Sequence, residues 1–272
     1  MAKLPIGIQL YSVRDALEKD FAGTLKELGK MGYDAVEFAG LANHTPEQVK
    51  KMCADAGVVP ISAHVARGVI MPDVDGVIGM YAEIGCKFIA IPWSDVIPGH
   101  PDYPKFLEDL KTISDACHKH GMVLLYHNHD FEFKKIDGKN KLDILYSDTD
   151  PSVLQTQIDT CWAKVGGEDP TKFVLKYTGR APLVHLKDFV GSKSANMYGL
   201  IDGGKAESEE VHPDVPFELR PVGYGIQDVL SILHASEKAG AQMVIVEQDQ
   251  PSLGRTSMEC AKLSIDYIKN IY

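Results

Sequence analysis

The sequence predicts an α/β fold with a single closed (β/α)8 TIM barrel. Apolar segments typical of strands alternate with amphipathic segments typical of helices from end to end, and this alternation predicts a parallel sheet covered by helices. Eight such units fit a chain of 272 residues, which is close to the usual length of this barrel. An open, doubly wound sheet is the alternative. It loses support because no glycine-rich nucleotide-binding motif follows an early strand.

The predicted strands are short apolar runs, and several of them pass into polar residues at their carboxyl ends. In the fifth strand, the run LLYHNHDFEF at 124–133 passes from two leucines and a tyrosine into two histidines, an aspartate and a glutamate. The predicted strands cover 6–10, 35–39, 59–65, 87–93, 122–128, 153–159, 182–189 and 243–249.

The predicted helices lie between these strands and carry signals for helix ends. In TPEQVKKMCADAG, Thr45 serves as the N-cap, Pro46 follows it, and Gln48 completes a capping box. The segments 21–32 and 102–121 stop at glycine, which favours helix termination. The predicted helices cover 21–32, 45–57, 102–121, 169–179, 225–240 and 257–270.

A long insertion follows the seventh predicted strand. Residues 190–225 lack helical or strand periodicity and are rich in glycine, serine, proline and acidic residues. A loop of this length in a compact domain is usually a lid, a binding loop or disordered. In a barrel it would lie on the face where active sites form.

Composition limits the classes of partner. The formal net charge is −10 and the pI is about 5.4, which argues against nucleic acid or an anionic membrane as the main partner. The chain has no apolar run long enough to span a bilayer and no apolar segment typical of a signal peptide. Its five cysteines are widely spaced and form no CxxC pair, so we expect reduced thiols in a cytoplasmic protein.

Polar side chains gather at the predicted carboxyl ends of the strands, where barrel active sites form. Residues i and i+2 share a strand face, so His127 and His129 are expected to point the same way. The polar or aromatic residues at strand ends are Gln9, Glu37, His64, Trp93, His127, His129, Asp159, His185, Lys187, Glu247 and Asp249.

The acids and imidazoles on strands five to eight predict a metal site. Each has a plainer explanation alone, because buried polar groups are usually just hydrogen-bonded. Asp159, for example, could cap the loop before Cys161. Four such groups unpaired in one cavity would be costly, and a divalent cation would remove that cost. Mixed imidazole and carboxylate ligands suit Mn²⁺, Co²⁺, Fe²⁺, Ni²⁺ or Zn²⁺ better than Ca²⁺ or Mg²⁺.

Six short segments follow one another in a familiar order: IGIQLYSVRD, YHNHDFEF, IDTCW, HLKD, RPVGYGIQD and VEQDQPS. Together they resemble the sugar phosphate isomerase/epimerase superfamily, the xylose-isomerase-like TIM barrels, which include ketose 3-epimerases, inosose dehydratase and dehydroshikimate dehydratase. The resemblance covers essentially the whole chain and implies one domain over residues 1–272. It is specific for the superfamily and not for one reaction.

The resemblance implies one divalent metal ion held by residues on strands five to eight. Asp159, His185 and Glu247 match the ligands on strands six, seven and eight. On strand five many members have a glutamate, and this chain offers His127. His127 is therefore either the fourth ligand or a neighbour of a site completed by water.

The resemblance implies a metal-dependent isomerase or epimerase that acts on a small sugar or keto-sugar, by proton abstraction next to a carbonyl and an enediolate intermediate. A lyase on the same scaffold, an inosose-type dehydratase or 3-keto-glycoside eliminase, is the alternative. In the epimerases the strand-five glutamate also transfers protons, and this chain lacks it. A sugar-binding barrel without catalysis is the third reading.

Individual roles follow from these classes. His129 or Glu247 is expected to carry the proton, since imidazole titrates near neutral pH. Lys187 is expected to steady a substrate oxygen, with a plain salt bridge as the alternative. The expected substrate-binding residues are Glu37, His64, Trp93, Glu132, Trp162 and Arg255, the last of which could also be a solvated surface residue.

The expected substrate is not phosphorylated, because no glycine-rich cradle for a phosphate is present. By analogy with related barrels, copies of the chain could pair through the loop face to form a homo-oligomer.

Overall fold

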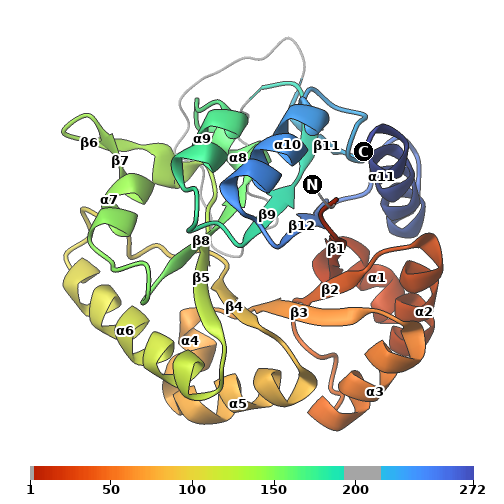
Figure 1. The fold of residues 1–272 in the computed structure, drawn as a ribbon, viewed down its shortest axis with the longest axis horizontal. Coiled ribbons are helices and arrows are strands. Elements are labelled where there is room, and N and C mark those ends of the chain that lie inside the picture. Colours follow the sequence, from red (N-terminus) through yellow and green to blue (C-terminus); the bar gives the residue numbers. More distant parts are fainter. Residues whose placement is uncertain (1–2, 193–215) are drawn as a thin grey trace.

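Eight parallel strands close into a barrel in the computed structural model, which describes residues 3–192 and 216–272. Helices surround the strands on the outside (Figure 1). β1 pairs with both β2 and β12, so the barrel has no open edge. The predicted fold class is confirmed. The barrel strands are β1 (Ile6–Gln9), β2 (Ala35–Phe38), β3 (Val59–His64), β4 (Phe88–Ile91), β5 (Val123–His127), β8 (Gln155–Asp159), β9 (Leu183–Leu186) and β12 (Met243–Val246).

Each of the six predicted helices is present, and the structure adds others. The segment VDGVIGMYAEI forms the full helix α5, which the sequence argument missed because two internal glycines lower its helix propensity. The helices are α1 (Arg14–Leu17), α2 (Phe21–Met31), α3 (Pro46–Ala56), α4 (Arg67–Ile70), α5 (Val74–Ile84), α6 (Tyr103–Lys119), α7 (Lys141–Ser147), α8 (Thr160–Val165), α9 (Pro170–Lys176), α10 (Val229–Ala239) and α11 (Ser257–Ile271), with short 3-10 turns at η1 (Leu10–Val13), η2 (Met71–Asp73) and η3 (Phe131–Phe133).

Local sequence signals explain where the helices begin and end. Thr45 and Gln48 form the predicted capping box at the start of α3. Gly32 ends α2 in the left-handed conformation, with φ at 95°, which costs glycine little because it has no Cβ. These caps support the elements that hold the strands in register.

Strand alternation divides the core into two layers. One set of side chains faces the helices, and the other fills the inside of the barrel. The inner layer is tight, because a Cβ added to Gly7 would lie 2.6 Å from Ile245 Cδ1. The inner cluster contains Ala35, Phe88, Ala90, Leu125, Leu183, Met243 and Ile245. The residues two positions after Ala35, Leu125, Leu183 and Ile245 share this inward face and meet above the apolar layer. They are Glu37, His127, His185 and Glu247.

The seventh predicted strand is interrupted. β9 ends at Leu186, and after Lys187 the chain starts β10 (Asp188–Val190), which pairs outside the barrel with β11 (Glu218–Arg220). The physical cause is the buried Asp188 carboxylate, which accepts four backbone N–H groups over 2.9–3.1 Å and so holds the chain away from the barrel wall. The donors belong to Phe189, Gly223, Gly225 and Gln227.

The predicted insertion 190–225 therefore starts and ends in an ordered antiparallel ribbon, while its part at 193–215 lies outside the described residues. A second small ribbon pairs β6 (Lys135–Ile136) with β7 (Lys139–Asn140) after β5. None of the helices in the described parts of the chain is long and apolar enough to cross a lipid bilayer.

Candidate metal centre and active site

A pocket of about 370 Å³ opens at the carboxyl ends of the strands. Its polar lining comes from strands on both sides of the barrel. These residues are His64, His127, His129, Lys187, Glu247 and Asp249. Barrel enzymes place their active sites at this face, so the pocket is the candidate site.

Four groups predicted as metal ligands lie together at the pocket. His127, Asp159, His185 and Glu247 each offer one ligand atom, and these atoms all lie within 4.8 Å of one another. All four residues are buried. They come from β5, β8, β9 and the end of β12, whose side chains meet because neighbouring parallel strands end at the same face.

Asp159 combines a capping role with a free oxygen. It is the last residue of β8, and its Oδ1 accepts the backbone N–H of Trp162 over 2.9 Å at the start of α8. Its buried Oδ2 has no hydrogen-bond partner among the described residues. Burial raises the pKa of Asp159 to about 7. Lys187 Nζ and His127 Nε2 are each 3.9 Å from Asp159 Oδ2, too far for a hydrogen bond. A buried carboxylate oxygen without a hydrogen bond is costly, and a bound metal ion would supply a direct partner.

His185 lies between two carboxylates. Its Nε2 is 2.7 Å from Glu37 Oε1, and its Nδ1 is 2.9 Å from Glu247 Oε2. Burial alone would lower the pKa of His185, but Glu37 and Glu247 raise it to about 10. Burial opposes the charge on Glu247 too, yet Lys187 and His185 hold the pKa of Glu247 well below its usual value. The Glu247 side chain is therefore a carboxylate at neutral pH.

The two histidines after the β5 apolar run both line the pocket, although β5 ends at His127 and His129 lies beyond the strand. His127 Nε2 is 3.9 Å from Asp159 Oδ2 and from Glu247 Oε2. His129 lies beyond the end of β5, and its ring stacks on Phe131 with centroids 5.5 Å apart. Neither Nδ1 has a hydrogen-bond partner among the described residues.

Both of these imidazoles are weak bases in this surrounding. Burial, and then the other histidines, hold the pKa of His127 well below its usual value. Burial and Lys187 lower the pKa of His129 to about 3. His129 was expected to titrate near neutral pH, whereas its lowered pKa makes it a neutral ring at that pH.

Lys187 is a buried ammonium in a carboxylate cluster. Its Nζ is 2.8 Å from Asp249 Oδ2 and 3.3 Å from Glu247 Oε2, and it lies 5.0 Å from the centre of the Trp162 ring. Burial would lower the pKa of Lys187, but Asp249, Glu247 and Asp159 raise it above its usual value. Lys187 therefore supplies fixed positive charge and does not accept a proton.

Two of the expected substrate-binding residues line the pocket, His64 and Trp93. The other four lie elsewhere. Glu37 lies at the centre of the barrel, and Trp162 packs beside Lys187. Arg255 has a half-exposed side chain, 3.6 Å from Glu259.

Glu132 turns away from the pocket and supports it. Its carboxylate accepts the Tyr126 hydroxyl over 2.7 Å and the backbone N–H of His129 over 2.8 Å. Burial raises the pKa of Glu132 to about 8. Glu132 therefore fixes the backbone of His129 and does not line the pocket as the predicted contact to substrate.

Two pocket residues with a carboxylate or a hydroxyl group were assigned no role from the sequence. Asp249 contacts Lys187, and its alternation with Glu247 was the available signal. Tyr11 lines the pocket from η1, just after β1, with the Arg14 guanidinium 4.1 Å from its ring centre. Its signal was an aromatic residue two positions after Gln9.

Comparison with known proteins agrees with this architecture. An inosose dehydratase from Clostridium botulinum (strain Alaska E43 / Type E3) is 29% identical over 164 residues, which cover 59% of this chain and 51% of that protein. The chain thus spans about half the length of this curated relative.

Solved structures show the same fold. A sugar phosphate isomerase/epimerase from Parabacteroides distasonis ATCC 8503 superposes with a TM-score of 0.78, at 24% identity and with 98% of each chain covered. An L-ribulose 3-epimerase superposes with a TM-score of 0.67, at 16% identity, with 99% of this chain and 94% of that chain covered. Residues 25–271 match the family of xylose isomerase-like TIM barrels, and this chain belongs to that family.

Proposed function

We propose that this protein is a divalent-metal-dependent isomerase or epimerase that removes a proton next to a carbonyl of a small sugar or keto-sugar. One observation carries the proposal: the buried Asp159 Oδ2 has no hydrogen-bond partner among the described residues and lies within a cluster of four potential ligands beside the pocket. A structural cluster would be expected to satisfy that oxygen.

The residues present fit a divalent ion. His127, Asp159, His185 and Glu247 would hold it through imidazole nitrogens and carboxylate oxygens. This donor set suits Mn²⁺, Co²⁺, Fe²⁺, Ni²⁺ or Zn²⁺. When bound, such an ion supplies positive charge that stabilises negative charge developing on a substrate oxygen.

The chain's own residues handle the proton. Glu247 and His129 both line the pocket, and their lowered pKa values leave a carboxylate and a neutral imidazole, both in the proton-accepting form, at neutral pH. Glu247 and His129 approach the pocket from different parts of the barrel, so one can remove a proton from one substrate atom while the other delivers a proton to a second atom or to the opposite face. Lys187 stays protonated and can donate a hydrogen bond to a substrate oxygen.

The pocket walls suit an uncharged, ring-shaped substrate. Trp93 and Tyr11 provide aromatic surface at the pocket, on which the apolar face of a sugar ring can pack. The charge of Lys187 is already paired with Asp249 and Glu247. The described lining thus offers no unpaired cation for a phosphate group.

An elimination reaction on a keto-sugar is the second candidate. The chain resembles an inosose dehydratase over 164 residues. In addition, β5 ends in histidines where the epimerase pattern has a proton-transferring glutamate. Elimination needs one base and one acid for the leaving hydroxyl, and does not need the paired carboxylates of that pattern.

Deuterium exchange tests both candidates in one experiment. The protein, loaded with Mn²⁺ or Co²⁺, is incubated in D₂O with a panel of ketoses, inososes and 3-keto glycosides, and the sugars are analysed by mass spectrometry. Deuterium uptake with no other change in composition supports the isomerase or epimerase. Loss of water or of an aglycone supports the lyase.

The controls separate the site from the rest of the protein. Asp159→Asn should abolish exchange, whereas Arg255→Ala, on the exposed surface, should retain it. Exchange that survives chelator would refute the metal-dependent mechanism. A metal-loaded protein that exchanges no sugar in the panel would favour the non-catalytic sugar-binding reading.

A further inference from the structure

Glu37 is a charged residue at the centre of the barrel with no place in the pocket lining. Its side chain is fully buried, and the pairing of β2 with β3 shifts register between Val36 and Glu37, so that Glu37 lies opposite Ser62. Burying a carboxylate is costly unless it is paired and hydrogen-bonded. The buried Glu37 carboxylate therefore depends on hydrogen-bond donors around it.

Donors from four other strands surround this carboxylate. Its Oε1 lies 2.7 Å from His185 Nε2 and 3.1 Å from His64 Nε2, so one oxygen contacts two imidazoles. We call Glu37 and the five residues that contact its carboxylate the Glu37 network. The remaining donors are Gln9 Nε2 at 2.8 Å, on the same oxygen, and Ser62 Oγ and Gln157 Nε2, both at 2.5 Å, on Oε2.

The Glu37 network determines the orientation of Gln157. A carboxylate only accepts hydrogen bonds, so the Gln157 atom beside Glu37 Oε2 is the amide nitrogen. The amide oxygen then faces His64 Nε2, at 2.6 Å. Because that oxygen also only accepts, His64 must carry its proton on Nε2. Gln9 is oriented in the same way: its Nε2 donates to Glu37 while its Oε1 accepts the Tyr11 backbone N–H.

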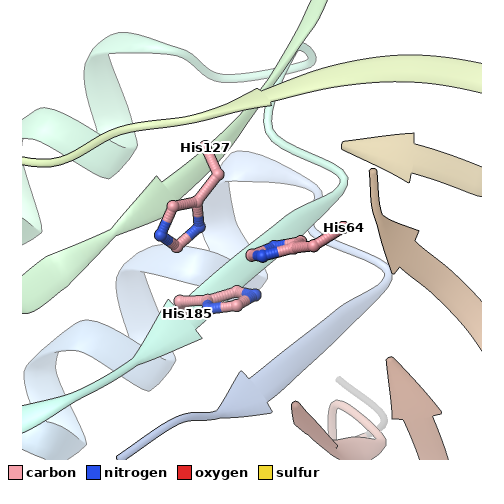
Figure 2. A group of neighbouring side chains, drawn as sticks. All are labelled: His64, His127 and His185. Atoms are coloured by element: carbon pink, nitrogen blue, oxygen red, sulfur yellow. The ribbon is translucent and has the colours of Figure 1, made fainter. Parts of the chain in front are cut away.

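The same reasoning applies to His185. Its Nε2 faces Glu37 and must donate, which leaves Nδ1 directed to Glu247 and the ligand cluster. The His64 and His185 rings are stacked almost parallel, with centroids 5.3 Å apart and an angle of 8° between the planes. Figure 2 shows them beside His127, which enters from β5.

We propose that Glu37 is a positioning residue: directly and through Gln157, it holds His64 and His185 with Nε2–H turned into the barrel, so that Nδ1 is the nitrogen each ring offers to a ligand. At His185 that ligand is the metal ion. At His64, which lines the pocket, it is a substrate hydroxyl. The consequence for turnover rests on the proposed function, whereas the ring tautomers and the metal affinity do not.

Glu37→Gln tests the proposal without changing the size of the side chain. An amide nitrogen in place of either carboxylate oxygen would face donors, His185 and Gln9 on one side or Ser62 and Gln157 on the other. Removing the hydrogen-bond partner of a metal-binding histidine typically lowers metal affinity about 10- to 100-fold. We expect a loss in that range for Zn²⁺, measured by competition with a chromophoric chelator.

Nitrogen NMR reads the ring orientation directly. In the Zn²⁺-loaded, ¹⁵N-histidine-labelled protein, long-range ¹H–¹⁵N spectra should show Nε2–H for both His64 and His185. Glu37→Gln should disturb both rings. Gln157→Met removes the 2.6 Å partner of His64 Nε2 and leaves only its 3.1 Å contact with Glu37, so the His64 Nε2–H signal should shift. His185, still bonded to Glu37, should keep its Nε2–H signal, and Zn²⁺ affinity should stay close to wild type.

Glu132→Gln is the matched control, because Glu132 is an equally buried glutamate whose carboxylate accepts hydrogen bonds from the Tyr126 hydroxyl and the His129 backbone N–H. It should leave Zn²⁺ affinity and both tautomers unchanged. Wild-type affinity and tautomers in Glu37→Gln, or an equal loss in Glu132→Gln, would overturn the proposal. If Glu37→Gln does not fold, Glu37→Asp decides, because the shorter side chain draws the carboxylate away from both imidazoles: wild-type tautomers and Zn²⁺ affinity in that variant would refute the positioning role.

Discussion

Replacing Lys187 by methionine removes the single ammonium from a cluster of buried acids while keeping most of the side-chain volume. The Lys187 side chain is 1% exposed, and its Nζ lies within 4 Å of three carboxylates. They belong to Asp159, Glu247 and Asp249. In the metal-free protein, Lys187→Met leaves these acids facing one another, with His185 beside Glu247 as the nearest remaining cation.

The magnitude follows from the burial of the charges left behind. Removing one partner of a buried ion pair costs about 3–5 kcal/mol. The pocket admits solvent, and the Asp249 side chain is 15% exposed, so we expect the lower end, about 3 kcal/mol. For a domain of this size, one kcal/mol lowers the melting temperature by about 2–4 °C, which gives a fall of about 6–12 °C.

The pH dependence has a definite sign. Burial raises the pKa of Asp159 to about 7, so the folded state holds this proton more tightly than the unfolded chain does. Stability therefore falls as pH rises from about 4 towards 7. Lys187 opposes this rise in the pKa of Asp159. Without Lys187 the pKa of Asp159 is higher still, so the pH range over which stability falls extends to higher pH. Lys187 also lowers the pKa of Glu247, a stabilising effect that is present above pH ~4.5 and is lost as pH falls. Both effects make Lys187→Met more damaging at pH 8 than at pH 5.

Differential scanning fluorimetry in the presence of chelator, from pH 5 to pH 8, measures these shifts. Lys51→Met is the control, because Lys51 forms an exposed pair with Asp55 on α3 and such pairs contribute little to stability. If Lys187→Met melts as Lys51→Met does at pH 8, or if its defect is larger at pH 5, the ammonium does not compensate these acids and the electrostatic account of the site is wrong.

Three further outcomes can be checked separately. Asp159→Asn should remove bound divalent metal, measured by elemental analysis, while the far-UV circular dichroism stays that of wild type; wild-type metal content would contradict the assigned ligand. Gly225→Ala should destabilise the folded chain by about 1–3 kcal/mol in urea unfolding, because the added Cβ would lie 2.1 Å from Asp188 Oδ1 and 2.4 Å from Phe189 O; an unchanged unfolding midpoint would contradict this. Arg255→Ala should leave metal affinity unchanged, because Arg255 contacts Glu259 on the surface; a lower affinity would place Arg255 in the site after all.

The barrel could be predicted because each of its strands has a recognisable local sequence pattern. Each barrel strand overlaps the predicted range, since a buried parallel strand is a short apolar run bounded by turn residues. The same local pattern explains why part of the candidate site could be predicted. Asp159, His185 and Glu247 stand at or just after the ends of such runs, and barrel geometry brings strand ends to one face.

Long-range contacts account for what the sequence argument missed. Glu37 looked like a pocket residue because it stands near a strand end, but its partners at positions 9, 62, 157 and 185 turn it into the barrel. No spacing rule links positions that far apart. Glu132 is similar, because its role depends on the hydroxyl of Tyr126 and on the turn that follows β5.

The histidine at the end of β5 can be understood from the charges around it. The family resemblance aligns His127 with a position where many members have a glutamate, and a glutamate there would add one more negative charge to a buried site. Like charges at short range disfavour each other's ionised form, and the site already places several carboxylates around the one ammonium of Lys187. A neutral imidazole keeps a ligand atom within reach of the metal cluster and adds no charge, so His127 fits a site whose acidic groups are supplied from elsewhere in the barrel. Those carboxylates are Asp159, Glu247 and Asp249.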